Sequence, residues 1–267
     1  MTASNDMTTM VVGASRGLGR GIATALADTG GRVIAVARSA PELALLAAQS
    51  AAIEIEVADA TDAVLPGTLL DRHEPRALIL VAGATPPLRP LPQQTWETFS
   101  VNWQTDVRIA FHWLREVLLR PLVPGSRVIV ISSGAALMGS PLSGGYAGAK
   151  ATERLITAYA QEESDRAGLG IHFTAVLPRL TPLTSLGRSA VTAYAARNGQ
   201  SDDDYVAAAG PSLTPEGAGA AVRELLAADA ATLAPDYLLT GAGLQPLPAR
   251  VGNGERISGA ADAPRPV

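Results

Sequence analysis

Tyr146 and Lys150, which are four positions apart, are the residues of this 267-residue chain whose types and spacing most clearly suggest chemistry. Of the 21 basic residues, Lys150 is the single lysine and the other 20 are arginines. The chain uses arginine at nearly every position that needs a positive charge. A lysine is therefore expected only where a guanidinium group cannot replace an ammonium. An ammonium is a compact three-donor point charge that can fit beneath a ribose and hold a neighbouring phenolate. The alternative is that this lysine persisted by chance.

A glycine-rich turn near the start of the chain could bind a phosphate group. Glycine lets the backbone turn sharply and approach a pyrophosphate, which exposed amides and the positive end of the following helix then hold. The turn lies between an apolar run and a helical stretch, where such a site is expected. A tight turn without a ligand is the weaker alternative. Its residues are Gly13, Ala14, Ser15, Arg16, Gly17, Leu18 and Gly19.

The residues that follow the second apolar run favour NADP(H) over NAD(H). An acid usually binds the ribose 2′-hydroxyl at this point, but the chain has Ala37 and Arg38. Arg38 can bind a 2′-phosphate through two hydrogen bonds, and Arg16 offers a second cation. We therefore expect NADP(H) as the preferred cofactor, with NAD(H) possible. The alternative makes both arginines solvated surface charges.

Short apolar runs alternate with helical segments along the chain, which predicts a parallel sheet covered by helices on both faces. The fold class is therefore α/β, with a doubly wound parallel sheet of about seven strands. The predicted strands are residues 10–12, 32–37, 53–57, 77–82, 127–131 and 171–177, and the predicted helices are residues 18–29, 41–50, 95–119 and 146–167.

One domain is expected over residues 10–247, between a flexible N-terminus (1–9) and a flexible C-terminal tail (248–267). Within it, the prolines of residues 85–92 predict an extended loop. Residues 181–213 mix small, polar and apolar side chains and are interpreted as an irregular, mobile flap over the substrate.

Composition excludes several classes of function. The net charge of −4 lacks the basic excess that a nucleic-acid binder needs. The absence of cysteine excludes disulfides and thiolate chemistry, and three scattered histidines do not predict a metal site. No apolar run approaches the roughly 18 residues of a membrane span. These features indicate a soluble, cytoplasmic protein without a membrane partner.

Taken together, the chain resembles the short-chain dehydrogenase/reductase family in its one-domain form, which has a Rossmann-type fold. The resemblance covers roughly residues 10–244 and rests on motifs in the family's order and spacing. Ser133 precedes Tyr146 by thirteen residues, the spacing that the family uses. The motifs are the glycine turn, Asp59, Asn102, Ser133 and the pair Tyr146 and Lys150.

The resemblance implies a role for each of these residues. Tyr146 is the expected general acid and base, and Ser133 stabilises the charge on the substrate oxygen. A free phenol titrates near pH 10, so Lys150, one helical turn further along, together with the charge of an oxidised nicotinamide, is expected to lower the pKa of Tyr146 toward the working range. Asn102 would hold a water molecule near the lysine. The cofactor would contact Gly13, Ser15, Arg16, Gly17, Leu18, Gly19, Arg38, Asp59, Ala82, Gly83, Tyr146, Lys150, Pro178 and Thr181.

Two segments depart from the family pattern. The chain has Leu80 and Val81 where the family has two asparagines, so hydrogen bonds that pin neighbouring strands are lost. Arg179 replaces the glycine beside the nicotinamide. It either recognises an acidic substrate or points to solvent. The usual threonine is displaced as well, which leaves Thr181 or Thr184 to contact the carboxamide.

The sequence therefore predicts reversible, NADP(H)-dependent interconversion of a ketone and a secondary alcohol, with a small-molecule carbonyl or alcohol as substrate. A homodimer or homotetramer is expected, formed through the helices of residues 95–119 and 146–167. The alternative from another class is a dinucleotide-binding sensor or scaffold that has the same fold and no turnover.

Overall fold

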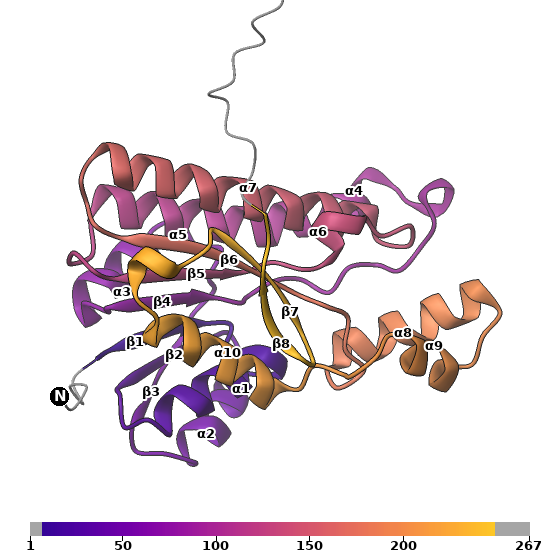
Figure 1. Ribbon diagram of the computed structural model, residues 1–267, viewed down its shortest axis with the longest axis horizontal. Coiled ribbons are helices and arrows are strands. Elements are labelled where there is room, and N and C mark those ends of the chain that lie inside the picture. Colours follow the sequence, from indigo (N-terminus) through magenta and orange to yellow (C-terminus); the bar gives the residue numbers. More distant parts are fainter. Residues whose placement is uncertain (1–6, 249–267) are drawn as a thin grey trace, which may run out of the picture.

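Eight strands form one sheet, in the order β3-β2-β1-β4-β5-β6-β7-β8, in the computed structural model, which describes residues 7–248 (Figure 1). The first seven strands are parallel, and β8 pairs antiparallel with β7. The strands are β1 (Thr9–Val12), β2 (Val33–Ala37), β3 (Ile53–Val57), β4 (Ala77–Leu80), β5 (Arg127–Ile131), β6 (His172–Pro178), β7 (Asp236–Thr240) and β8 (Gly243–Pro246).

Helices cover both faces of this sheet, which confirms the predicted doubly wound, Rossmann-type α/β fold (Figure 1). Helices α1 (Gly17–Ala27), α2 (Ala40–Ala47) and α10 (Pro215–Ala227) lie on one face. Helices α3 (Leu65–His73), α5 (Arg108–Leu119) and α7 (Gly144–Arg166) lie on the other. None of the described helices is long and apolar enough to cross a membrane.

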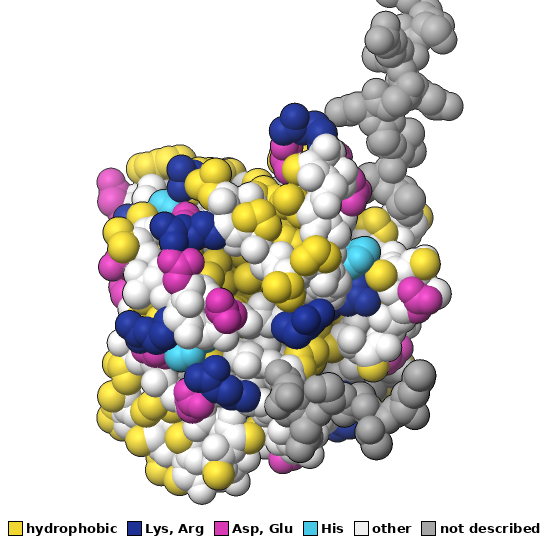
Figure 2. Space-filling model, turned by 90° about the vertical axis from the view of Figure 1, so that its left-hand side faces the viewer, with side chains coloured by type: hydrophobic (Ala, Val, Ile, Leu, Met, Phe, Trp, Pro, Cys, Tyr) yellow, Lys and Arg dark blue, Asp and Glu magenta, His cyan; other side chains and the backbone are white. Residues whose placement is uncertain are grey.

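Charged side chains of both signs are mixed over the end of the molecule that Figure 2 shows, which is the left-hand end of Figure 1. Exposed arginines commonly pair with acids. Arg32 lies 2.7 Å from Glu54, and Arg72 lies 2.8 Å from Glu56. Such exposed pairs add little stability but neutralise the arginines locally.

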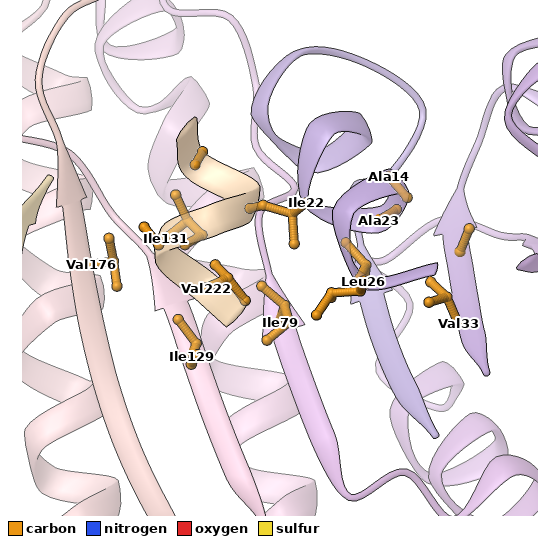
Figure 3. Close-up of a cluster of buried hydrophobic side chains, with 14 of the residues drawn as sticks. Ala14, Ile22, Ala23, Leu26, Val33, Ile79, Ile129, Ile131, Val176 and Val222 are labelled. Carbon is orange, nitrogen blue, oxygen red and sulfur yellow. The ribbon is translucent and has the colours of Figure 1, made fainter. Parts of the chain in front are cut away.

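The core is divided by the sheet into two apolar clusters because successive side chains of a strand point to opposite faces. In β1, Val11 belongs to one cluster, whereas Met10 and Val12 belong to the other. Figure 3 shows the first cluster, in which Ile22 from α1 and Val222 from α10 point toward the strands. These buried strands explain why the sequence reads as short, continuous apolar runs.

The parallel strands end at the same edge of the sheet, and this edge positions the site. Val12 at the end of β1 pairs with Val36 and with Leu80, so the segments that follow these three strands leave the sheet side by side. The strand order reverses between β1 and β4, and doubly wound folds bind ligands in the crevice at that point.

Two predicted elements are corrected by the structure. Residues 95–119 do not form one helix: α4 (Trp96–Phe99) and α5 flank a π-helical turn, η2 (Trp103–Val107). Residues 181–213 are not irregular, since they contain α8 (Ser185–Asn198) and α9 (Asp202–Ala208). The apolar period continues through a π-turn, and α8 is rich in small residues that give little periodicity, so neither feature was evident from the pattern.

Several shorter elements were not predicted. Strands β7 and β8 and helix α3 were missed, as were α6 (Ala135–Met138) and the 3₁₀ turns η1 (Leu91–Gln93) and η3 (Ala230–Thr232). Residues 85–90 form the predicted extended loop. The predicted flexible ends fall largely on residues 1–6 and 249–267, which lie outside the described residues, and Thr9 already belongs to β1.

Candidate active site

A cleft of about 1010 Å³ lies at the carboxyl ends of the strands. It extends from the glycine turn, past the ends of β4 and β5, to the α8–α9 hairpin. The structure brings the predicted site residues together here, except for Asn102, which is buried behind the cleft wall. Those lining the cleft are Gly13, Ser15, Arg16, Gly17, Leu18, Gly19, Arg38, Asp59, Ala82, Gly83, Ser133, Tyr146, Lys150, Pro178 and Thr181.

The glycine turn has the geometry of a phosphate cradle. Gly13 has φ +101°, and a Cβ atom there would lie 2.5 Å from the Ala82 nitrogen. A Cβ atom on Gly19 would lie 2.1 Å from the Gly13 carbonyl oxygen. Helix α1 begins after Arg16 without a capping hydrogen bond from that side chain. Its first amides are therefore available to an anion such as a pyrophosphate.

Positive charge at this end of the cleft is not neutralised. Arg16 and Arg38 are exposed, and neither forms a salt bridge within residues 7–248, in contrast to Arg32 and Arg72. Asp59 accepts hydrogen bonds from the amide and hydroxyl of Thr61, at 3.0 and 2.8 Å. These bonds lower the pKa of Asp59, and the charge of Arg38 lowers it further. Two exposed cations therefore lie at this end of the cleft, one of them close enough to Asp59 to affect its ionisation.

Close contacts fix the position of the Tyr146 and Lys150 helix. A Cβ atom on Gly145 would lie 1.8 Å from the Phe99 carbonyl oxygen, so only glycine allows α7 to approach α4 this closely. The Ser132 hydroxyl at the end of β5 donates a 2.7 Å hydrogen bond to the Lys150 carbonyl oxygen. Ser132 is therefore a positioning residue that sequence reasoning missed, although it directly precedes Ser133.

Tyr146 is a phenol rather than a phenolate at neutral pH. Burial raises its pKa, and the opposing effects of Lys150 and of a hydrogen bond with Ser133 do not overcome burial. The carboxylates of Asp106 and Glu153 raise the pKa further. The effect of Lys150 has the expected direction, but burial outweighs it and the pKa is raised overall. The expected shift toward the working range, to which the charge of an oxidised nicotinamide also contributes, stays a prediction.

Lys150 is held between two buried acids that sequence reasoning also missed. Its Nζ atom lies 3.2 Å from Asp106 Oδ2, and 3.1 and 3.0 Å from Glu153 Oε1 and Oε2. The exposed fractions are 5% for Lys150, 1% for Asp106 and 3% for Glu153. Burial lowers the pKa of Lys150, but the two carboxylates outweigh burial and raise it overall. The spacing of Glu153, three residues after Lys150 on one helix face, was a signal available in the sequence.

Asn102 and Asp106 hold the turn that follows β4. The Asn102 side chain donates to the Ala84 carbonyl oxygen at 2.8 Å, and Asp106 accepts from the Ala84 amide at 2.7 Å. Asn102 also donates to Asp106 at 3.2 Å. These bonds pin the turn in a chain that lacks the two asparagines at Leu80 and Val81.

The end of the cleft beside α8 and α9 contains Arg179, Thr181 and Thr184. Arg179 is exposed, and its charge opposes the effects of burial and of Tyr194, which raise the pKa of Tyr205. The Thr181 hydroxyl donates to the Leu213 carbonyl oxygen at 2.5 Å. Thr184 caps α8 by accepting from the Gly187 amide. Both candidate hydroxyls are therefore engaged within the protein.

The chain belongs to the short-chain dehydrogenase family. A family model described as short chain dehydrogenase matches residues 7–194, a range that includes the glycine turn, Ser133, Tyr146 and Lys150. Helix α9 and the last strands lie beyond the matched range.

Two curated relatives are reductases. Human L-xylulose reductase is 32% identical over 127 residues, which cover 46% of this chain and 52% of that protein. D-erythrulose reductase of Gallus gallus is 29% identical over 127 residues, which cover 46% of this chain and 51% of that protein. The chain spans about half the length of the curated relatives it matches.

Solved structures share the fold. A crystal structure of a variant of actinorhodin polyketide ketoreductase with NADPH has a TM-score of 0.77 at 20% identity, covering 90% of this chain and 98% of that chain. A short chain dehydrogenase from Mycobacterium avium has a TM-score of 0.73 at 18% identity, covering 97% of this chain and 90% of that chain. At these identities the likeness shows the fold alone.

Replacing Asp106 tests whether it holds the site together. Asp106→Ala leaves the Ala84 amide without its acceptor and removes one of the two acceptors of the Asn102 side chain, so the free energy of unfolding should fall by about 1–3 kcal/mol. Urea unfolding measures the change. The exposed Asp203→Ala on α9 is the control and should change it by less than about 0.5 kcal/mol. Equal effects of the two substitutions would contradict the assignment.

Proposed function

We propose that the protein is an oxidoreductase that interconverts a small-molecule ketone and a secondary alcohol with NADP(H). The observation that carries this proposal is that one cleft is lined at one end by the glycine turn and Arg38 and at the other by Ser133 and Tyr146. A dinucleotide held at the first end would reach the tyrosine at the second. The reductase names of both curated relatives support the same reaction type.

The residues present fit a dinucleotide cofactor. The first amides of α1 would hold its pyrophosphate, and Arg16 and Arg38 its 2′-phosphate. Asp59 would contact the adenine, and Lys150 the ribose next to the nicotinamide. Bound NADP(H) supplies or accepts the hydride. Ala82, Gly83, Pro178 and Thr181 would line the rest of this path.

Tyr146 would transfer the proton. As a buried phenol it can donate its proton to the carbonyl oxygen of a ketone while Ser133 hydrogen-bonds that oxygen. The reverse reaction would require the phenolate, which the raised pKa of Tyr146 disfavours in the protein without a cofactor. Asn102 would affect the reaction indirectly, because its side chain holds the turn after β4 and hydrogen-bonds Asp106.

Residues 10–247 would form one domain, in which α8 and α9 would be the substrate flap. A homodimer or homotetramer would cover the exposed apolar side chains on η2, α5 and α7, and light scattering of the protein in solution tests this. These side chains are Trp103, Phe111, Leu155 and Tyr159.

Removing the Tyr146 hydroxyl tests the reaction. Tyr146→Phe should lower ketone reduction by about 10²–10⁴-fold while NADPH binding, followed by fluorescence, is retained. Tyr159→Phe removes an exposed hydroxyl from the same helix and should leave both unchanged. Tight NADPH binding without turnover of any ketone or quinone in a broad panel would instead favour the sensor or scaffold.

Reversing the charge at Arg38 tests the cofactor preference. Arg38→Asp should weaken NADPH binding by about 10- to 100-fold, because charged hydrogen bonds to the 2′-phosphate are lost, and should affect NADH far less. Fluorescence titration with each cofactor measures the change, and the exposed Arg223→Asp on α10 is the control. An unchanged ratio of the two affinities would make Arg38 a solvated surface charge.

Replacing Arg179 tests the class of substrate, since this residue is a cation at the proposed substrate end of the cleft. If it binds an acidic group, Arg179→Gly should raise KM for ketones that bear a carboxylate by about tenfold, with little change for uncharged ketones of similar size. Parallel kinetics on both kinds of ketone provide the comparison. An equal change for both would refute recognition of an acid.

A further inference from the structure

Three charged side chains are buried together where α7 packs against the π-turn η2. Lys150 and Glu153 come from α7, and Asp106 comes from η2. The lysine nitrogen is within 3.2 Å of both acids. The cluster therefore holds one ammonium and two carboxyl groups with almost no access to water.

The two acids differ in what else they bind. Asp106 accepts hydrogen bonds from the Ala84 amide and from Asn102, so its carboxylate has partners besides the lysine. Glu153 contacts Lys150 through both of its carboxylate oxygens, Oε1 at 3.1 Å and Oε2 at 3.0 Å. Asp106 alone would suffice to neutralise Lys150. Glu153 is thus an extra acid whose one hydrogen-bonding contact is with the lysine of the site.

Burying a second carboxylate at this place costs free energy, and the raised pKa of Glu153 reflects that cost. Burial raises the pKa of Glu153 to about 7, and Asp106 also raises it, against the lowering effect of Lys150. Titratable groups with strongly shifted pKa values concentrate at functional sites. The adjacent Arg154 pairs with Asp236 of β7 at 2.6 Å.

The net charge of this cluster affects the ionisation of Tyr146. Lys150 Nζ lies 5.7 Å from the centre of the Tyr146 ring, and its charge favours the phenolate. Asp106 and Glu153 act in the opposite sense through the same low-dielectric region. With Asp106 alone the cluster would be neutral. With Glu153 ionised as well, it carries one net negative charge.

We propose that Glu153 is a positioning residue for proton transfer, which offsets the charge of Lys150 and so disfavours the phenolate of Tyr146. This inference rests on the proposed function. It assigns part of the control over the Tyr146 proton to one side chain that does not line the cleft. Removing the charge of Glu153 should make the phenol more acidic.

The experiment compares Glu153→Gln with Glu163→Gln, which removes an exposed carboxylate from the same helix. Ultraviolet absorbance of the phenolate is followed over the pH range in which circular dichroism shows each protein folded. Subtracting the titration of the matching Tyr146→Phe protein isolates Tyr146 among the five tyrosines. The Tyr146 midpoint should fall by about one pH unit in Glu153→Gln and stay unchanged in Glu163→Gln.

Kinetics provide the second readout. In Glu153→Gln the basic pH midpoint of kcat/KM for alcohol oxidation, which reports formation of the phenolate, should fall by about one pH unit, in step with the absorbance midpoint. A second variant, Glu153→Leu, distinguishes an electrostatic role of Glu153 from a structural one. It leaves Lys150 paired with Asp106, and it should fold at least as stably as the parent because an uncompensated buried carboxyl group is gone.

The outcomes separate this inference from the proposed function. A lower Tyr146 midpoint in both Glu153 variants supports the inference, even if no ketone is reduced and the proposed function is wrong. Unchanged midpoints in folded Glu153→Gln and Glu153→Leu, with ketone reduction intact, would overturn it. Loss of stability in both variants without a change of midpoint would make Glu153 a structural residue and overturn it as well.

Discussion

Lys150 carries its positive charge inside the molecule, and a buried ammonium is tolerated only where carboxyl groups compensate it. The compensating groups lie on separate elements, Asp106 on η2 and Glu153 on α7. The lysine can therefore occupy its place only when α7 is packed against η2. Site and helix packing depend on each other, and the close contact at Gly145 is one of the conditions for both.

The same carboxylate connects the proton-transfer end of the cleft with its cofactor end. Asp106 contacts Lys150 through one oxygen and the Ala84 amide through the other. A Cβ atom on Gly83 would lie 2.7 Å from Asp106 Oδ2, so the turn after β4 packs directly on this acid. The wall of the cleft and the charge behind it are thus held by one side chain, which explains how the turn is fixed without the family's asparagines.

The two ends of the cleft are built differently. The phosphate end consists of backbone amides, glycines with close contacts and exposed arginines, so it depends mainly on local conformation. The opposite end depends on α8 and α9, which are tied to the rest of the protein by side chains. Tyr194 hydrogen-bonds Ser140 in the segment before Tyr146 and stacks on Tyr205 at a centroid distance of 6.3 Å. Variation in this hairpin would change this end of the cleft and leave the glycine turn intact.

The sequence by itself determined the features that are local. The glycine spacing reflects contacts within one turn, the spacing of Tyr146 and Lys150 reflects the helix period, and the apolar runs reflect strands buried on both faces. Only the tertiary structure decided the ionisation of Tyr146, because that depends on burial and on acids from different elements. It also decided that residues 181–213 contain two helices, α8 and α9, because the small side chains of α8 give no clear apolar pattern in the sequence. A pKa is set by distances through space, and the chain alone does not contain those distances.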